Sequence, residues 1–174
     1  MFYKMIENKC KEWYSSDQCT VRNLIEYIEK TGQMRDAQIE AIKVYLFLKI
    51  GCECKPLEFL FRYGCFNSIN LNDIELSTAT REYLEENPAA TALFEYSRLT
   101  NDKGEQVSEK LEKQIKKDPS SIDYDAFFRT AFYGVSYTDY LFSLPMGAGK
   151  TYLMAAFIYL DLYFALNEPT NPAF

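Results

Sequence analysis

The sequence predicts a mainly α-helical fold that passes, near its C-terminal end, into the beginning of an α/β domain. Over the first two thirds of the 174 residues, apolar side chains recur at helical spacing between short Gly, Pro and Asn breaks. An aromatic-rich run bounded by Gly134 and Pro145 is then typical of a β-strand. A glycine-rich loop and a long apolar stretch follow that run. The change of pattern marks the predicted start of the α/β part.

Three helices are expected at the N-terminal end, over residues 2–14, 20–31 and 34–50. Thr20 belongs to a residue type that can cap the second helix, and Gly32 lies just past its end. The third helix is apolar nearly all the way round, which predicts a central position in the fold.

Five more helices are expected over residues 56–63, 78–86, 88–99, 105–117 and 123–132. Ser77, Asn87 and Asp123 can cap three of them with their side-chain oxygens. We expect residues 1–135 to form a mainly helical N-terminal region, within which residues of about 52–135 are an inserted helical part.

Residues 136–174 are expected to begin a second, α/β domain. The run 137–144 predicts a strand, and residues 150–166 predict an apolar helix. The loop Met146–Thr151 lies between these two elements.

The composition excludes several kinds of chemistry. The chain has no histidine, which excludes Ser-His-Asp and Cys-His catalysis, imidazole zinc sites and a histidine pH switch. The net charge is −6 and the pI is about 4.8, whereas a free-standing nucleic-acid-binding domain usually carries a basic patch and a high pI. No apolar run approaches the ~20 residues of a membrane span.

Five cysteines are present, and we expect them to be reduced in a cytoplasmic protein, because their number is odd and the first residues do not resemble a secretory signal. Cys52, Cys54 and Cys65 are alternative ligands for a soft metal. The paired Cys-x-x-Cys spacing of such sites is missing, and a free cysteine commonly packs as a small buried hydrophobic residue. The pattern therefore favours packed thiols over a metal site.

The loop Met146–Thr151 has the residues of a phosphate-binding loop. Gly147, Ala148 and Gly149 allow the backbone to curl so that successive amide N–H groups point into one concavity at the positive end of a helix. Lys150 would reach the β and γ phosphates of a nucleotide, and the Thr151 hydroxyl would ligate Mg²⁺. The alternative interpretation is a glycine-rich turn with a surface lysine.

A departure from the strict phosphate-loop pattern limits which family of phosphate-loop proteins the segment can resemble. Leu144 stands where that pattern has its first Gly, and Pro145 follows it. The segment 144–151 resembles motif I of superfamily-two DEAD/DEAH-type helicases, in which this Gly is often replaced. Upstream, residues 34–42 look like the Arg-x-x-Gln-x-Glu-Ala segment of these enzymes, most closely in the helicase (Res) subunits of type III restriction enzymes.

This resemblance implies an N-terminal part of an ATP-dependent DNA helicase or translocase, of the kind found in restriction and phage-defence systems. The C-terminal residues would then begin a truncated RecA-like domain. In the family the Gln reads the adenine edge, which assigns this role to Gln38, with Arg35 on the same helix face. The alternative for Arg35 and Gln38 is the polar face of an ordinary amphipathic helix.

The implied cofactors of the parent protein are ATP and Mg²⁺. Its implied partners are DNA, the remaining helicase lobes, and a nuclease or methyltransferase subunit. No catalytic set is complete in this chain, because the acidic strand end and the arginine finger of such motors are missing. We therefore expect a truncated fragment that is inactive in isolation.

Two further interpretations stay open. The first is a non-enzymatic helical module that binds a protein partner and carries a vestigial phosphate loop. The second is a fragment of a P-loop kinase or GTPase, against which the Leu144-Pro145 departure argues.

Overall fold

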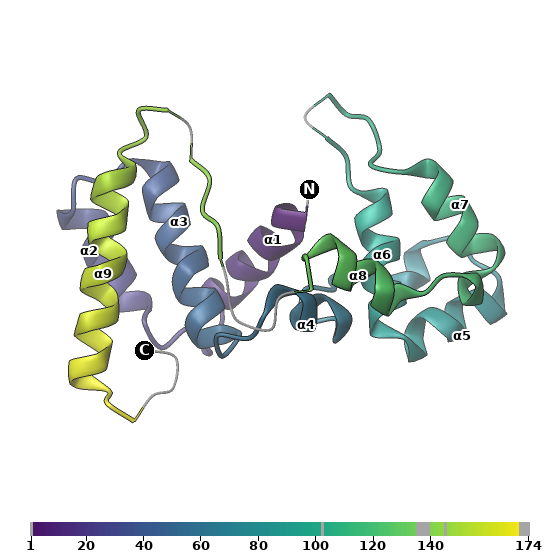
Figure 1. Ribbon diagram of the computed structural model, residues 1–174, viewed down its shortest axis with the longest axis horizontal. Coiled ribbons are helices and arrows are strands. Elements are labelled where there is room, and N and C mark those ends of the chain that lie inside the picture. Colours follow the sequence, from purple (N-terminus) through teal and green to yellow (C-terminus); the bar gives the residue numbers. More distant parts are fainter. Residues whose placement is uncertain (1, 102, 135–139, 145, 171–174) are drawn as a thin grey trace. The chain divides into compact units, whose positions relative to one another are not determined.

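The computed structural model describes residues 2–101, 103–134, 140–144 and 146–170, and over these residues the chain is mainly α-helical without a β-strand (Figure 1). Two compact units are formed, one from residues 1–9 and 56–138 and the other from residues 10–55 and 139–174. The first is called the insert unit below, because residues 56–138 interrupt the sequence of the second, which is called the loop unit. Among the described residues, no helix is both long and apolar enough to cross a bilayer.

The loop unit is built around α3 (Asp36–Leu46), which contacts α2 (Arg22–Thr31) and α9 (Lys150–Asn167). Figure 1 shows α9 lying alongside α3. The pattern of α3 predicted this central place, and seven of its eleven residues are buried. The last turn of the predicted helix is wound more widely, as a π-helix over Phe47–Gly51, beside the indole of Trp13.

A polar contact fixes α9 against α3. The carboxylate of Asp161 accepts hydrogen bonds from the hydroxyl of Tyr45 and, at 2.9 Å, from Nζ of Lys49. The ring of Phe157, one helical turn earlier on α9, stacks on the ring of Tyr45 with centroids 4.2 Å apart. Burial raises the pKa of Tyr45, and its hydrogen bond to the Asp161 carboxylate raises it further.

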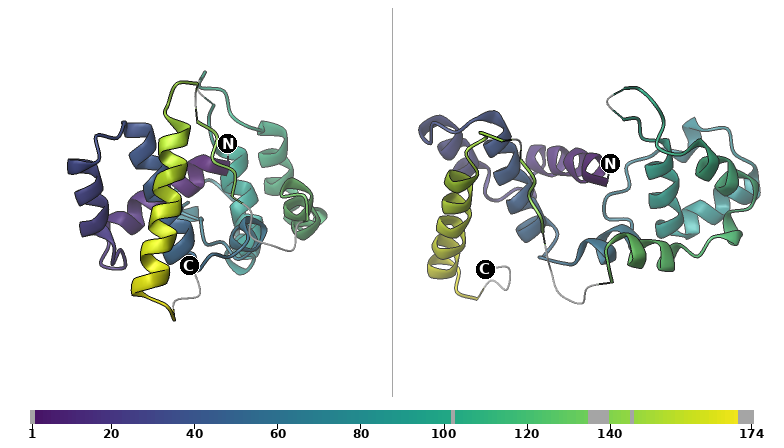
Figure 2. Two further views of the ribbon diagram at one scale, coloured as in Figure 1. Left: turned by 60° about the vertical axis from the view of Figure 1, so that its left-hand side comes forward. Right: turned by 45° about the horizontal axis from the view of Figure 1, so that its top comes forward.

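In the described residues of the insert unit, five α-helices follow the N-terminal part of α1 (Phe2–Ser15): α4 (Leu57–Arg62), α5 (Thr78–Glu86), α6 (Pro88–Arg98), α7 (Glu109–Lys117) and α8 (Tyr124–Ala131). Figure 2 shows these helices, coloured blue to green, from two further sides. Four phenylalanines, Phe61, Phe66, Phe94 and Phe128, are fully buried in its core. Side chains of Ser77, Asn87 and Asp123 cap α5, α6 and α8 as predicted.

A buried carboxylate ties the segment before α5 to this core. Glu95 of α6 is 7% exposed. It accepts hydrogen bonds from the hydroxyl of Ser68 at 2.6 Å and from the backbone amides of Ser68 and Ile69 at 2.9 and 3.1 Å. Because three donors satisfy it, the carboxylate can remain in the interior without an opposite charge.

The strand predicted over 137–144 is absent from its described residues. Residues 137–139 lie outside the described residues, and 140–144 have no regular secondary structure. They are held by side chains: the Tyr140 hydroxyl donates to the Lys55 carbonyl at 2.7 Å, and the Phe142 ring contacts Tyr45 and Phe157. A strand needs neighbouring strands for its backbone hydrogen bonds, and no described segment offers one.

Two predicted helix starts are also wrong. Val21, not Thr20, is the cap position of α2. The helix expected from residue 105 begins at Glu109, because Ser108 caps it and Gln106 pairs with Thr100 in an isolated antiparallel bridge. Both errors concern ends at which a competing turn decides the boundary.

We predict that Glu95→Gln lowers the free energy of unfolding by about 1 kcal/mol, because the Ser68 and Ile69 amides, which share one carboxylate oxygen, would then donate to a neutral amide oxygen in place of a charged one. Urea denaturation measures this loss. Glu82→Gln, an exposed position on α5 in the same unit, is the matched control. Equal unfolding midpoints for the two variants would contradict the role of Glu95.

We also predict that stability falls as the pH rises above about 10, the ordinary pKa of a tyrosine. Tyr45 has a raised pKa in the folded chain, so it keeps its proton there after the unfolded chain has lost it, and high pH favours unfolding. Burial raises the pKa values of Tyr124 and Tyr140 in the same direction. Thermal unfolding between pH 8 and 11 should show a smaller loss in Tyr45→Phe than in the exposed-site control Tyr27→Phe.

Candidate functional site

The loop predicted to bind phosphate forms a turn that leads directly into α9. Gly147 and Gly149 have φ angles of 78° and 76°, in the left-handed region where glycine is favoured. Lys150 is the first residue of α9, and the Gly149 carbonyl accepts the first hydrogen bond of that helix from the Leu153 amide at 3.1 Å. The free amides of the first turn make this end of an 18-residue helix electropositive.

The start of α3 lies against this loop. The guanidinium of Arg35 donates to the carbonyl of Gly147. Nε2 of Gln38 donates to the carbonyl of Gly149 at 3.0 Å. The two segments that the sequence singled out are thus in direct contact, although 111 residues separate Gln38 from Gly149.

The carboxamide of Gln38 is engaged at both of its ends. Its Oε1 accepts from the backbone amide of Arg35 at 2.8 Å, which caps the first turn of α3, while its Nε2 donates to Gly149. The side chain is buried, with the residue 4% exposed. Gln38 is therefore not on the solvated face that an ordinary amphipathic helix would give it.

Helices α3 and α9 run in the same direction. Gln38 faces Gly149 near their N-terminal ends, and Lys49, in the π-helical turn that continues α3, faces Asp161 farther along α9. Both electropositive ends therefore lie at the loop, together with the exposed side chains of Arg35 and Lys150. Asp36 is the one acidic residue in the first turn of α3, and α9 has none in its first turn.

The two glycines differ in their surroundings. A Cβ atom added to Gly149 would lie 2.6 Å from Nε2 of Gln38, whereas one added to Gly147 would meet nothing within 4 Å. Gly149 is thus required for its conformation and for the close approach of Gln38, and Gly147 for its conformation alone.

In the part of the chain that the structure describes, no strand precedes this turn, so the predicted strand–loop–helix arrangement of a phosphate-binding loop is not seen. Lys150 and Thr151 are exposed, and Ala148 lies between the two left-handed glycines. Among the described residues, no group of three Cys, Asp or Glu side chains could hold a metal ion. The role of Thr151 as a ligand of Mg²⁺ stays a prediction from the sequence.

Sequence reasoning did not assign a role to Tyr45, Lys49 or Asp161, which hold α9 on α3. The signal was present, because Asp161 is the only carboxylate in the apolar stretch 150–166. Lys49 lies one helical turn beyond Tyr45 on the neighbouring element.

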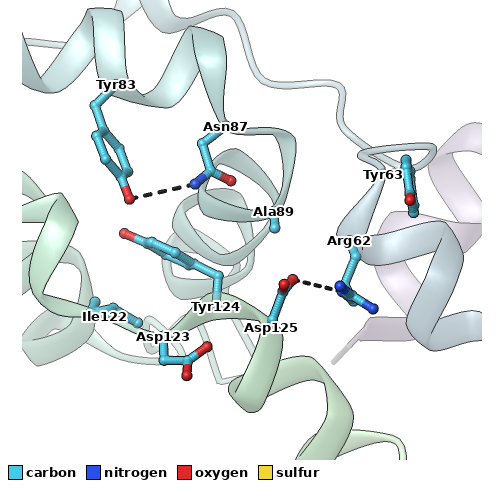
Figure 3. Close-up of a pocket in the computed structure, with 9 residues that line it drawn as sticks. All are labelled: Arg62, Tyr63, Tyr83, Asn87, Ala89, Ile122, Asp123, Tyr124 and Asp125. Carbon is cyan, nitrogen blue, oxygen red and sulfur yellow. Dashed lines mark hydrogen bonds and ion pairs between the residues drawn. The ribbon is translucent and has the colours of Figure 1, made fainter.

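A polar pocket of about 340 Å³ lies in the insert unit, between α4, α5 and α8 (Figure 3). Two of its charged groups pair with each other: Nε of Arg62 donates to Asp125 at 2.7 Å, and this bond holds the pKa of Asp125 below its ordinary value. Tyr124 in its wall donates to the Pro119 carbonyl at 2.7 Å. The pocket thus presents mostly satisfied groups, and no sequence motif falls on it.

Comparisons of the chain with models of known protein families, with curated proteins and with solved structures found no match. The resemblance to helicase subunits of type III restriction enzymes therefore stays a prediction from residues 34–42 and 144–151. The contact between these two segments is the structural observation that bears on their joint role.

We predict that Gly149→Ala destabilises the chain more than Gly147→Ala. Each alanine would be forced into a left-handed conformation at a cost of about 1–2 kcal/mol. The Gly149 variant would also displace Gln38, with a further loss of about 1 kcal/mol for its hydrogen bond.

Urea unfolding of the two single variants measures this difference. Adding Gln38→Ala to each tests its cause, because the double variant with Gly149→Ala should lose less than the sum of its two single effects. Additive losses, or equal losses for the two glycines, would contradict the steric argument.

Proposed function

We propose that this chain is part of an ATP-dependent DNA helicase or translocase of the superfamily-two type, and that Met146–Thr151 binds the phosphates of ATP. One observation supports it most strongly: two segments far apart in sequence, each resembling a nucleotide-binding motif, meet at the carbonyls of Gly147 and Gly149. If each motif had arisen by chance, there would be no reason for the two segments to contact each other.

In this proposal the phosphates lie at the electropositive end of α9. The backbone amides of Gly147, Ala148, Gly149 and Lys150 donate to phosphate oxygens, and the Lys150 side chain places its charge on the β and γ phosphates. The Thr151 hydroxyl ligates the Mg²⁺ that accompanies the nucleotide. Both side chains are exposed at the start of the helix, as these roles require.

ATP turnover is proposed for the parent protein and not for this chain. Hydrolysis at such a loop needs a carboxylate that orients Mg²⁺ and water, and an arginine from a second lobe. The proposal places these groups, the strands of a RecA-like domain, and the contacts to DNA and to a nuclease or methyltransferase subunit in further parts of a cytoplasmic assembly. The adenine contact predicted for Gln38 stays a prediction.

A second candidate is supported by the exposed apolar side chains of α9. Met154, Ile158 and Leu162 are 58%, 56% and 58% exposed, and repeat at helical spacing on one face. In the helicase proposal the rest of the α/β domain covers this face. In a non-enzymatic module a separate protein partner would cover it, and the loop would not bind nucleotide.

We predict that Mg·ATP binds to the 174-residue chain and that Lys150→Ala weakens this binding roughly tenfold or more, since a charge-assisted contact to phosphate is removed. Isothermal titration calorimetry measures both affinities. Lys103→Ala removes the same charge at an exposed position of the insert unit and serves as the control.

The two candidates differ in the outcome. Weaker binding in Lys150→Ala alone supports the phosphate site. No binding to the unsubstituted chain, or equal affinities in both variants, would contradict it and favour the interaction module.

A further inference from the structure

We propose that Gln38 is a positioning residue of the phosphate loop, which holds the Gly149 carbonyl on α3 and so aims the loop amides at the phosphates, instead of reading the adenine base. This inference rests on the proposed function. It assigns to Gln38 a role different from the one that the family resemblance implies.

The first argument is the use of its polar atoms. A carboxamide that reads adenine must offer a donor and an acceptor to the base edge. In Gln38 the donor is bound to the Gly149 carbonyl and the acceptor to the Arg35 amide. To reach a base, the side chain would have to leave both partners, each at the cost of an unmade hydrogen bond.

The second argument concerns direction. A trans peptide group is planar, and its C=O and N–H point in opposite directions. The Gly149 carbonyl accepts from Gln38 and from the Leu153 amide, so it points along α9, and the Lys150 amide of the same peptide group points out past the start of that helix. The Gly147 carbonyl points to the Arg35 guanidinium, so the Ala148 amide points away from that group. The two tethered carbonyls therefore fix the directions of two donors of the loop.

The third argument is the fit between the two residues. No side chain other than hydrogen can occupy position 149 with Gln38 in its present place, because a Cβ would lie 2.6 Å from Nε2. The same carbonyl also accepts from the Leu153 amide at 3.1 Å. Gln38 thus shares an acceptor with the first hydrogen bond of α9. Loss of the Gln38 contact should therefore weaken that hydrogen bond.

The test compares three ligands: Mg·ATP, Mg·GTP and Mg·tripolyphosphate, which has no base. Gln38→Met keeps the length of the side chain and removes both hydrogen bonds. We expect it to weaken all three ligands by a similar factor, roughly tenfold, with the ratio of ATP to GTP affinity unchanged. Gln18→Met, at an exposed position of the same unit, should change none of them.

The opposite result is equally clear. If Gln38→Met weakens ATP alone and leaves tripolyphosphate unchanged, Gln38 reads the base and the inference is overturned. Gln38→Glu is the second variant, because it retains the acceptor for Arg35 and lacks the donor for Gly149. Because the added charge by itself repels a phosphate ligand, this variant is compared without ligand: its Leu153 amide should exchange faster than in the unsubstituted chain, and an unchanged rate would also overturn the inference.

Hydrogen exchange separates this inference from the proposed function. In the chain without ligand, the Leu153 amide should exchange several-fold faster in Gln38→Met than in the unsubstituted chain, while the Leu160 amide, deeper in α9, serves as the control and keeps its rate. An unchanged Leu153 rate overturns the positioning role. If no phosphate ligand binds to the unsubstituted chain, the proposed function fails, and the exchange rates still decide whether Gln38 holds the loop.

Discussion

The fold of the loop unit depends on the pairing of α3 with α9, and one carboxylate sets that pairing. Asp161 is the only acidic residue of an otherwise apolar helix, and it meets both Tyr45 and Lys49. Its side chain is 44% exposed, so solvent screens the ion pair and its contribution to stability is small. Its effect is on register, because a slip of one residue would remove the carboxylate from both partners.

The register of α3 against α9 also determines which residues meet at the N-terminal ends of the two helices. With Asp161 opposite Lys49, Gly149 comes opposite Gln38, and both helix N-termini lie at the glycine turn. The apolar stacking of Phe157 on Tyr45 supplies contact area between these two points. A polar contact far from the loop therefore places the loop, and the insert unit interrupts the sequence between α3 and α9 without taking part in this contact.

Patterns within a short stretch of sequence predicted most of the helices, whereas contacts between residues far apart in the sequence could not be predicted. Ser77, Asn87 and Asp123 cap their helices through bonds to amides three residues away, so their pattern is complete in a short window. The strand expected before the loop failed in its described part, because a strand depends on neighbours that a short window does not contain. The site residues were named from motifs, but the bond from Gln38 to Gly149 spans 111 positions and leaves no periodicity to detect.

The groups gathered at the loop bear on what kind of ligand it can select. They are backbone amides, the cations of Arg35 and Lys150, and a hydroxyl, all of which suit phosphate oxygens. Such groups respond to charge and not to the identity of a base. Gln38 carries the one carboxamide here that could pair with the edge of a base, and both its donor and its acceptor are already hydrogen-bonded within the chain. Under the proposed function, selection of one nucleotide over another would require residues outside this constellation, or release of the Gln38 side chain from Arg35 and Gly149.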